Sequence, residues 1–541
     1  MPGQSAVGRH GQLNPASEVH SLLTRPFRAR SAGALLAATA RAGLTAVFLM
    51  ASLRLQIAAI RSSGDDFWPT AILIGGSLAL GAWRPRAALM AFTLAAPILS
   101  GLSQNTLLGC AFSASLVFSG IWMGTMVNRL LPRGLWGDSP PEGTGISGRT
   151  VPLLTADLLI AAVALSLAWQ LWRHREAATL WSILLKQPVF GYGDPNYFMT
   201  SAFLWLQGLF FFRGQCGLWS TPTAAVSVAQ SDAAAAAGWV RIVFLVYGIA
   251  MAVFVLVQVT LQIPEGWTSA GLQAPFEDIS SFGSMAAAVF IFVVATRRKA
   301  PFGTLTAGLV ACAGLLAMLV ASWSRAAWLS GLVFLSLVAV FRLPRFWVAT
   351  LIALPVAAVI FMNFSPRAAV WTQEPYLARL GALVRLESPA AKDPVRLNLY
   401  RKATAMISRR PLSGHGIGSF YLTSMDFARP GDPHAGEPDF AHNFLLQVAA
   451  ELGLPAAVLL AGLVTWGLWS GIRAWLRRRQ EEPSPSAGAL TLLGATFSLG
   501  AYLQTQLTAN SLNVYASNQF FFWFLLAALL AMSSPDRGPD S

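Results

Sequence analysis

The stretch from Trp239 to Leu261 is WVRIVFLVYGIAMAVFVLVQVTL, in which Arg241 is the only charged side chain. A helix needs about 20 consecutive apolar residues to cross a bilayer, so this stretch predicts a membrane-spanning helix. Such blocks recur with polar segments between them and predict an all-α, polytopic transmembrane helical bundle of about 12–14 helices. The blocks are residues 33–60, 67–83, 87–102, 107–127, 151–171, 197–212, 239–261, 282–295, 302–321, 326–341, 346–364, 455–475, 487–507 and 515–532.

The composition supports a membrane protein. Of the 541 residues, 55% are hydrophobic and 11% are charged, whereas soluble proteins carry about 25% charged residues. The chain therefore lacks the polar surface of an ordinary cytosolic protein. Its net charge of +14 does not indicate a nucleic-acid partner, because most Lys and Arg lie at the ends of apolar blocks, where they set topology. Cys110, Cys216 and Cys312 are far apart, so we expect neither disulfides nor structural zinc.

The basic clusters predict the orientation. With the N-terminus inside, every second block ends in Lys or Arg on the cytoplasmic side, as the positive-inside rule requires. We therefore expect a multi-pass protein of the cytoplasmic membrane, with an irregular Ala/Ser-rich inner segment at residues 221–238. The expected regions are a cytoplasmic tail (1–32), an N-terminal transmembrane region (33–238), a core transmembrane region (239–363), a large outer loop (364–441), a C-terminal transmembrane region (442–532) and a cytoplasmic tail (533–541).

Ionisable residues are scarce inside the blocks. Asp157 lies near a block end, while Arg41 and Arg54 belong to the first block. Ion-coupled carriers usually need charged residues near the membrane midplane. The distribution instead favours a site at the outer membrane surface.

Two basic motifs are candidates for anion binding there. Arg325 follows Ser324 in a tight turn between two blocks, and its guanidinium could clamp a phosphate; the alternative is an arginine snorkelling at the interface. Arg396 and Tyr400 lie four residues apart on a helix expected at residues 395–408, with Pro411 as its stop. For Arg401, Lys402, Arg409 and Arg410 the alternative is a solvated basic face against anionic lipid. His415 lies in the glycine-rich segment 414–418, which predicts a tight turn with positive φ.

His442 is the candidate general base. We expect it in the first turn of a helix capped by Asp439, where the helix dipole disfavours the imidazolium and leaves a neutral, proton-accepting ring. An interfacial structural histidine is the alternative. Asn443, Gln447 and Glu451 form a polar stripe on the same helix.

Together these motifs resemble the O-antigen ligase and O-antigen polymerase family of bacterial membrane glycosyltransferases. The resemblance covers roughly residues 239–475. It is carried by SWSRAAWL (322–329), RLNLY (396–400), PLSGHGIGSF (411–420) and HNFLLQVAAELG (442–453). The chain departs from the family in having Tyr400 where Trp is common, and in having nearer fourteen blocks than twelve.

The resemblance implies a C-type glycosyltransferase-like enzyme whose active site faces the periplasm. Its donor is a glycan on undecaprenyl diphosphate, and its acceptor is a hydroxyl of another glycan or of the lipid A core. Arg325 and Arg396 would hold the diphosphate and His442 would take the acceptor proton, with inversion and with no metal or cofactor. Lipopolysaccharide ligation, polysaccharide polymerisation and protein glycosylation all remain open. Candidate substrate-binding residues are Ser324, Tyr400, Arg401, His415 and Asn443; expected partners are membrane lipids and, for a polymerase, a chain-length regulator.

Three other functions remain as alternatives. Asp65 and Asp66 could hold a divalent metal in a different kind of lipid-linked sugar transferase. A flippase or exporter of lipid-linked polysaccharide would need a charged cavity through the membrane. A structural protein of an envelope polysaccharide machine would need no catalytic residues.

Overall fold

In the computed structural model the chain forms two units, Met1–Val47 and Phe48–Ser541, and the principal helices belong to the second. The residues that the structure describes are 67–104, 113–130, 150–174, 197–218, 232–262, 279–297, 324–342, 394–432, 439–482, 484–508 and 516–534, together with the single positions 45, 48, 49, 52, 56, 315, 316, 322 and 512.

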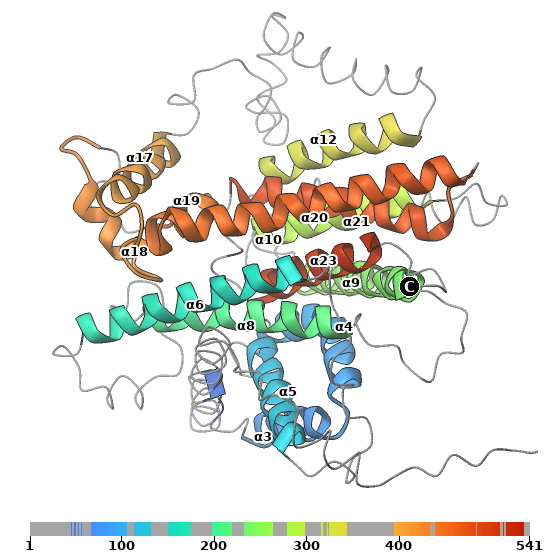
Figure 1. Ribbon diagram of the computed structural model, residues 1–541, viewed down its shortest axis with the longest axis horizontal. Helices are drawn as coiled ribbons and strands as arrows, with labels where there is room; N and C mark the ends of the chain where they lie inside the picture. Colours follow the sequence, from blue (N-terminus) through green and yellow to red (C-terminus); the bar gives the residue numbers. More distant parts are fainter. Residues whose placement is uncertain are drawn as a thin grey trace, which may run out of the picture. The chain divides into compact units, whose positions relative to one another are not determined.

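These residues form helices joined by turns, and none of them lies in a strand (Figure 1). The all-α prediction is therefore confirmed. The principal helices are α3 (Phe67–Trp83), α4 (Pro85–Gln104), α5 (Ser113–Leu130), α6 (Thr150–Arg173), α8 (Tyr197–Leu218), α9 (Asp232–Gln262), α10 (Ile279–Thr296), α12 (Arg325–Arg342), α17 (Pro394–Arg409), α19 (Phe444–Leu452), α20 (Leu454–Glu481), α21 (Ala487–Gln506) and α23 (Ala516–Ser533).

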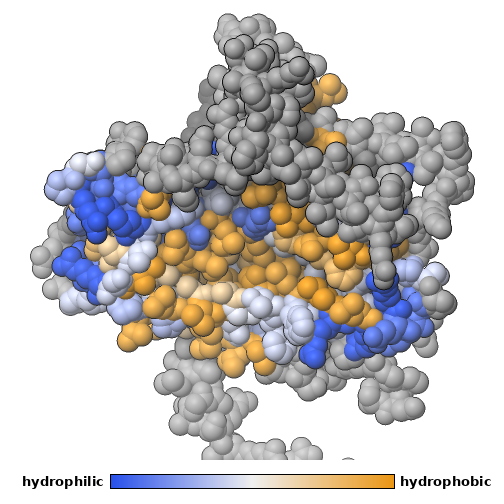
Figure 2. Space-filling model, turned by 90° about the horizontal axis from the view of Figure 1, so that it is seen from above, coloured by the Kyte–Doolittle hydropathy of each residue, from blue (hydrophilic) through white to orange (hydrophobic). Residues whose placement is uncertain are grey.

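The helices are those of a membrane protein. Four of those described are long and apolar enough to cross a bilayer, namely Val151–Arg173, Ala233–Val253, Arg325–Arg342 and Leu454–Glu481. Figure 2 shows apolar side chains gathered along the middle of the visible face, with hydrophilic side chains towards either end. The predicted helical membrane protein is confirmed. The block at residues 346–364, and most of those at 33–60 and 302–321, lie outside the described residues.

Block boundaries predicted most helix boundaries, with one clear error. Helix α3 spans the same residues as its block, whereas α9 begins at Asp232. The prediction that residues 221–238 are irregular is therefore wrong for residues 232–238. The run Ala233–Ala237 is helical because alanine has the highest helix propensity.

Aromatic packing joins the N-terminal helices to the C-terminal ones. Phe92 of α4 lies edge-on to Phe520 of α23, with ring centroids 4.7 Å apart. Phe118 of α5 and Phe211 of α8 also pack against Phe520, at 5.2 Å each. These rings are almost completely buried. Helices of the expected N-terminal transmembrane region therefore share a core with α23.

Contacts along α21 show which helix ends lie together. Ser498 donates a hydrogen bond to the Ala288 carbonyl of α10 at 2.7 Å, and Ser330 of α12 donates to the Ala501 carbonyl. Phe341, near the end of α12, packs on Phe497, which precedes Ala501 in α21. Helix α21 thus runs antiparallel to α12, and its C-terminal end lies at the level where α12 begins.

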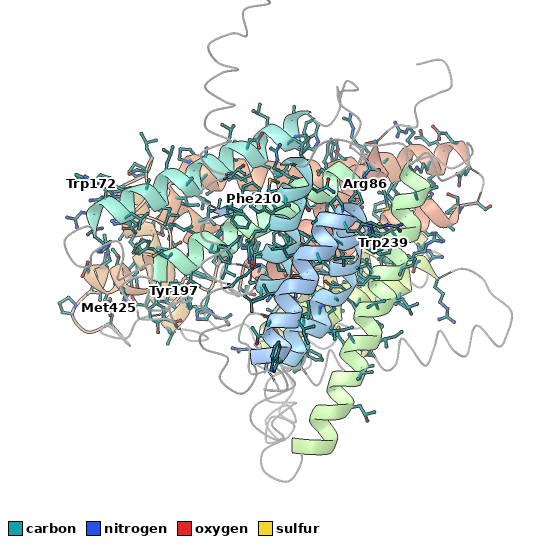
Figure 3. All side chains as sticks on the ribbon, turned by 90° about the horizontal axis from the view of Figure 1, so that it is seen from below. Arg86, Trp172, Tyr197, Phe210, Trp239 and Met425 are labelled. Carbon is teal, nitrogen blue, oxygen red and sulfur yellow. The ribbon has the colours of Figure 1, made fainter. Side chains whose placement is uncertain are left out.

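The opposite end carries arginines that the sequence pattern predicts on the cytoplasmic side. Arg342 donates to the carbonyls of Val294 and Ala295, at 3.0 and 2.6 Å, and Arg478 donates to that of Met532 at 2.9 Å. Figure 3 shows the same polarity, because Arg86 and Trp239 lie towards one end of the helices and Trp172, Tyr197 and Met425 towards the other. We call the latter end, where α12 begins, the site end.

A glycine of α10 lets the turn before α12 approach closely. A Cβ at Gly283 would come within 2.8 Å of Ser324 Cβ and 2.9 Å of both Ala327 Cβ and Ser322 Oγ. The close contact at Gly283 thereby fixes the position of the start of α12, where Arg325 lies.

We therefore expect Gly283→Ala to lower the free energy of unfolding by about 1–3 kcal/mol through overpacking. Gly76→Ala is the matched control, because nothing lies within 4 Å of its Cβ; it should be neutral or stabilising by up to about 1 kcal/mol. Thermal denaturation in detergent micelles measures both. Equal behaviour of the two variants would contradict the close approach.

Candidate functional site

Helices α17 and α19 lie at the site end, and the described residues 410–432 and 439–443 lie between them in sequence (Figure 1). Helix α17 matches the predicted residues 395–408 to within one residue at each end. After it come a short helix, Phe420–Thr423, and a 3₁₀ turn, Ser424–Phe427. The pieces enclose a small apolar core made by Ala403, Met406, Phe420, Ala441 and Ala450.

The glycine-rich loop folds onto the end of α19. Gly414, Gly416 and Gly418 have φ values of 63°, 109° and 68°, which confirms the predicted tight turn with positive φ. The His415 N–H donates to the Ala450 carbonyl, and the Gly416 N–H to that of Glu451, both at 2.9 Å. The loop therefore satisfies carbonyls that the end of a helix leaves unpaired.

The buried side chain of Glu451 holds this loop through hydrogen bonds. Its side chain is 3% exposed. Its two oxygens accept from the Gly418 N–H at 2.8 Å and the Phe420 N–H at 3.2 Å, and the Gln447 amide donates to it at 3.0 Å. Burial raises the pKa of Glu451 to about 7, against the lowering effect of these three hydrogen bonds. The helical spacing predicted Glu451 in a polar stripe, but that spacing carries no signal of its role in holding the loop.

His442 has an unusual backbone. Among the residues that the structure describes, it is the only non-glycine residue with a positive φ, which is 48°. Such a conformation costs free energy and is found most often at functional sites. The expectation that His442 lies in the first helical turn is wrong, because α19 begins at Phe444 with Asn443 as its N-cap. Asn443 Oδ1 accepts from the Leu446 N–H at 3.1 Å. Asp439, expected as the cap, instead contacts the His442 ring at 3.2 Å.

Contacts on both sides hold this backbone in place. The Ala441 N–H donates to Gln447 Oε1 at 3.3 Å, and the Tyr400 hydroxyl donates to the His442 carbonyl at 3.5 Å. Gln447 is itself bound to Glu451. The strained histidine is therefore supported from α17 and from α19.

Tyr400 also links this region to the helices that carry the arginines. Its hydroxyl lies 3.5 Å from the Leu507 carbonyl, just after α21. Arg396 lies one turn before Tyr400 on the same face of α17. Arg325 begins α12, where Ser324 Oγ accepts from the Ala327 N–H at 3.3 Å. Because the C-terminal end of α21 lies at the level where α12 begins, Arg325, Arg396 and His442 share the site end.

The basic face of α17 is only partly solvated. Arg401 donates to Asn398 Oδ1 at 2.7 Å and pairs with Asp432, and its hydrogen bond is the main reason that the pKa of Asp432 is lowered. Lys402 is 1% exposed. The alternative of a solvated face is therefore wrong for Lys402, although Arg409 and Arg410 are exposed.

His415 lies inside the loop's packing. It is 5% exposed, and its Nε2 lies 3.1 Å from the Met406 carbonyl of α17. Burial is the main cause that lowers its pKa, assisted by the charges of Arg410, Arg409 and Arg173. These contacts give His415 a role in holding the loop on α17.

Among the residues that the structure describes, no cluster of three or more His, Cys, Asp or Glu side chains is arranged to hold a metal ion. Asp65 and Asp66, on which the metal-dependent alternative rests, lie outside the described residues.

The bundle of apolar helices defines an integral membrane protein, and one end of this bundle carries a strained backbone and charged side chains. Residues 310–461, which include Arg325, α17 and His442, match the family model described as O-antigen ligase. The match confirms, for this segment of the chain, the resemblance drawn from the motifs. The comparison with curated proteins gives no match.

The titration of Glu451 predicts a pH dependence of stability. Its ordinary pKa is 4.5, so between that pH and about 7 the folded protein keeps a proton that the unfolded chain loses. Stability should therefore fall by up to about 3 kcal/mol as the pH rises through this window, and then level off. Thermal denaturation between about pH 4.5 and 8 measures the slope. It should be smaller in Glu451→Gln, which cannot titrate, and an unchanged slope in that variant would contradict the assignment.

Proposed function

We propose that this protein transfers a glycan from an undecaprenyl diphosphate carrier to an acceptor hydroxyl at the periplasmic face of the inner membrane. The acceptor is a sugar of another glycan chain or of the lipid A core. The observation that carries the proposal is His442: a backbone at φ 48°, with a ring against a carboxylate, inside the segment that matches O-antigen ligase.

The proposed chemistry uses groups at the site end. The acceptor oxygen attacks the anomeric carbon from the face opposite the diphosphate, which inverts the configuration. The bond between that carbon and the diphosphate oxygen breaks, and its electron pair leaves with the diphosphate. Arg325 and Arg396 stabilise the growing negative charge, for which fixed guanidinium groups are most effective. His442 takes the acceptor proton, so the reaction uses no metal ion.

The orientation is part of the proposal. Arg342 and Arg478, which the positive-inside rule places in the cytoplasm, lie at the end opposite α17 and His442. This distribution supports a site that opens towards the periplasm.

Purified protein in liposomes should transfer glycan from undecaprenyl-diphosphate-linked donor to added acceptor in the presence of EDTA. His442→Ala should lower kcat by about 10²–10⁴-fold, because the acceptor hydroxyl loses its base. His174→Ala is the matched control: this half-buried histidine at the end of α6 stacks on Phe198, and it should keep kcat within about twofold. Full activity of His442→Ala would refute the mechanism, and activity that requires a divalent metal would refute metal independence.

The two arginines can be tested through the leaving group. Arg325→Lys and Arg396→Lys keep the charge but lose the planar, bidentate donors that match a diphosphate. Each should lower kcat by at least about tenfold, and the alanine variants by about 10²–10³-fold. Arg478→Ala, at the opposite end, should not change kcat. Alanine variants with unchanged kcat would show that these arginines do not stabilise the departing diphosphate.

A further inference from the structure

The chemical steps proposed above assign no function to the carboxylate beside the His442 ring. Asp439 Oδ2 lies 3.2 Å from His442 Nε2. The other oxygen, Oδ1, accepts from the Phe440 N–H at 2.7 Å, so the carboxylate is held by its own backbone. The two side chains are 38% and 34% exposed, which leaves the pair accessible at the surface of the site end.

The charge of Asp439 decides which ring nitrogen carries the hydrogen. Burial acts to raise the pKa of Asp439, but the hydrogen bond and charge of His442, the Phe440 N–H and the charge of Lys402 together bring it below its ordinary value. An ionised carboxylate can only accept hydrogen bonds. In the neutral ring Nε2 therefore carries the hydrogen, and Nδ1 keeps its lone pair.

The charged and titratable groups around this pair come from two elements. Tyr400 of α17 donates to the His442 carbonyl. Lys402, two residues further along α17, is 1% exposed, and its charge acts on both Asp439 and Asp432. Glu451, on α19, faces the glycine-rich loop. The charge of the buried Lys402 helps to keep the Asp439 carboxylate ionised where it meets the ring.

We propose that Asp439 is the positioning residue of His442: it holds Nε2 and presents Nδ1 as the atom that accepts the proton of the acceptor hydroxyl. This inference rests on the proposed function. As the oxygen–carbon bond to the acceptor forms and the bond to the diphosphate breaks, the proton moves to Nδ1. The resulting imidazolium lies against the Asp439 carboxylate, which stabilises it until the proton passes to solvent.

Asp439→Asn tests the assignment through its pH profile. The substitution keeps the size of the side chain and removes its charge, so kcat should fall at least about tenfold while KM for the lipid-linked donor stays within about twofold. The acid limb of the rate–pH profile should move to lower pH, because the imidazolium loses its anionic partner. Asp439→Glu should restore part of the rate and of the acid limb. Asp426→Asn, a change to an exposed carboxyl in the neighbouring 3₁₀ turn, should change none of these.

A titration that needs no turnover separates this inference from the proposed function. In protein with isotope-labelled histidine, the resonance lost in His442→Gln reports the pH midpoint of His442 protonation. Asp439→Asn should lower that midpoint and Asp426→Asn should not. An unchanged midpoint, or unchanged kcat and acid limb, would overturn the role of Asp439. If wild-type protein transfers no glycan while Asp439→Asn still lowers the midpoint, the proposed function is refuted and the pairing of Asp439 with His442 stands.

Discussion

The buried carboxylate of Glu451 is the interaction on which the site depends. It accepts from two backbone N–H groups of the loop and from the amide of Gln447, and Gln447 in turn accepts from the Ala441 N–H. One carboxylate therefore joins α19, the glycine-rich loop and the backbone just before His442. Removing such a group would leave several buried N–H donors unpaired, each at a cost of about 1–3 kcal/mol.

The membrane explains why this arrangement lies at a helix end. Backbone polar groups in the hydrocarbon region must be satisfied within helices, so irregular backbone such as the loop and the segment before α19 belongs outside it. Gly453, with φ 88°, ends α19 and lets the chain turn into α20. The Leu454 N–H then donates to the Pro411 carbonyl at 2.7 Å. The start of the spanning helix α20 is thereby joined directly to the segment that carries the site.

The sequence predicted the elements of the site better than their local roles. The motif around His442 located the histidine, and the spacing of Arg396 and Tyr400 located α17. The position of His442 relative to its helix was wrong because Asn443 provides the N-cap, a position that Asn and Asp favour about equally, so composition alone did not choose between Asn443 and Asp439. Lys402 was assigned to a solvated face because helical periodicity shows which residues share a face, but not which neighbour covers it.

What the sequence determined by itself is the class of structure and the chemistry available to it. Apolar block lengths set by the bilayer, and glycines required where φ is positive, are local constraints that leave a direct record in the order of residues. The pairing of Asp439 with His442, the burial of Lys402 and the fastening of the loop by Glu451 were decided only by the tertiary structure. These interactions depend on the backbone conformation at His442 and on which surfaces the packing of α17 against α19 brings together, and neither can be read from residue spacing alone.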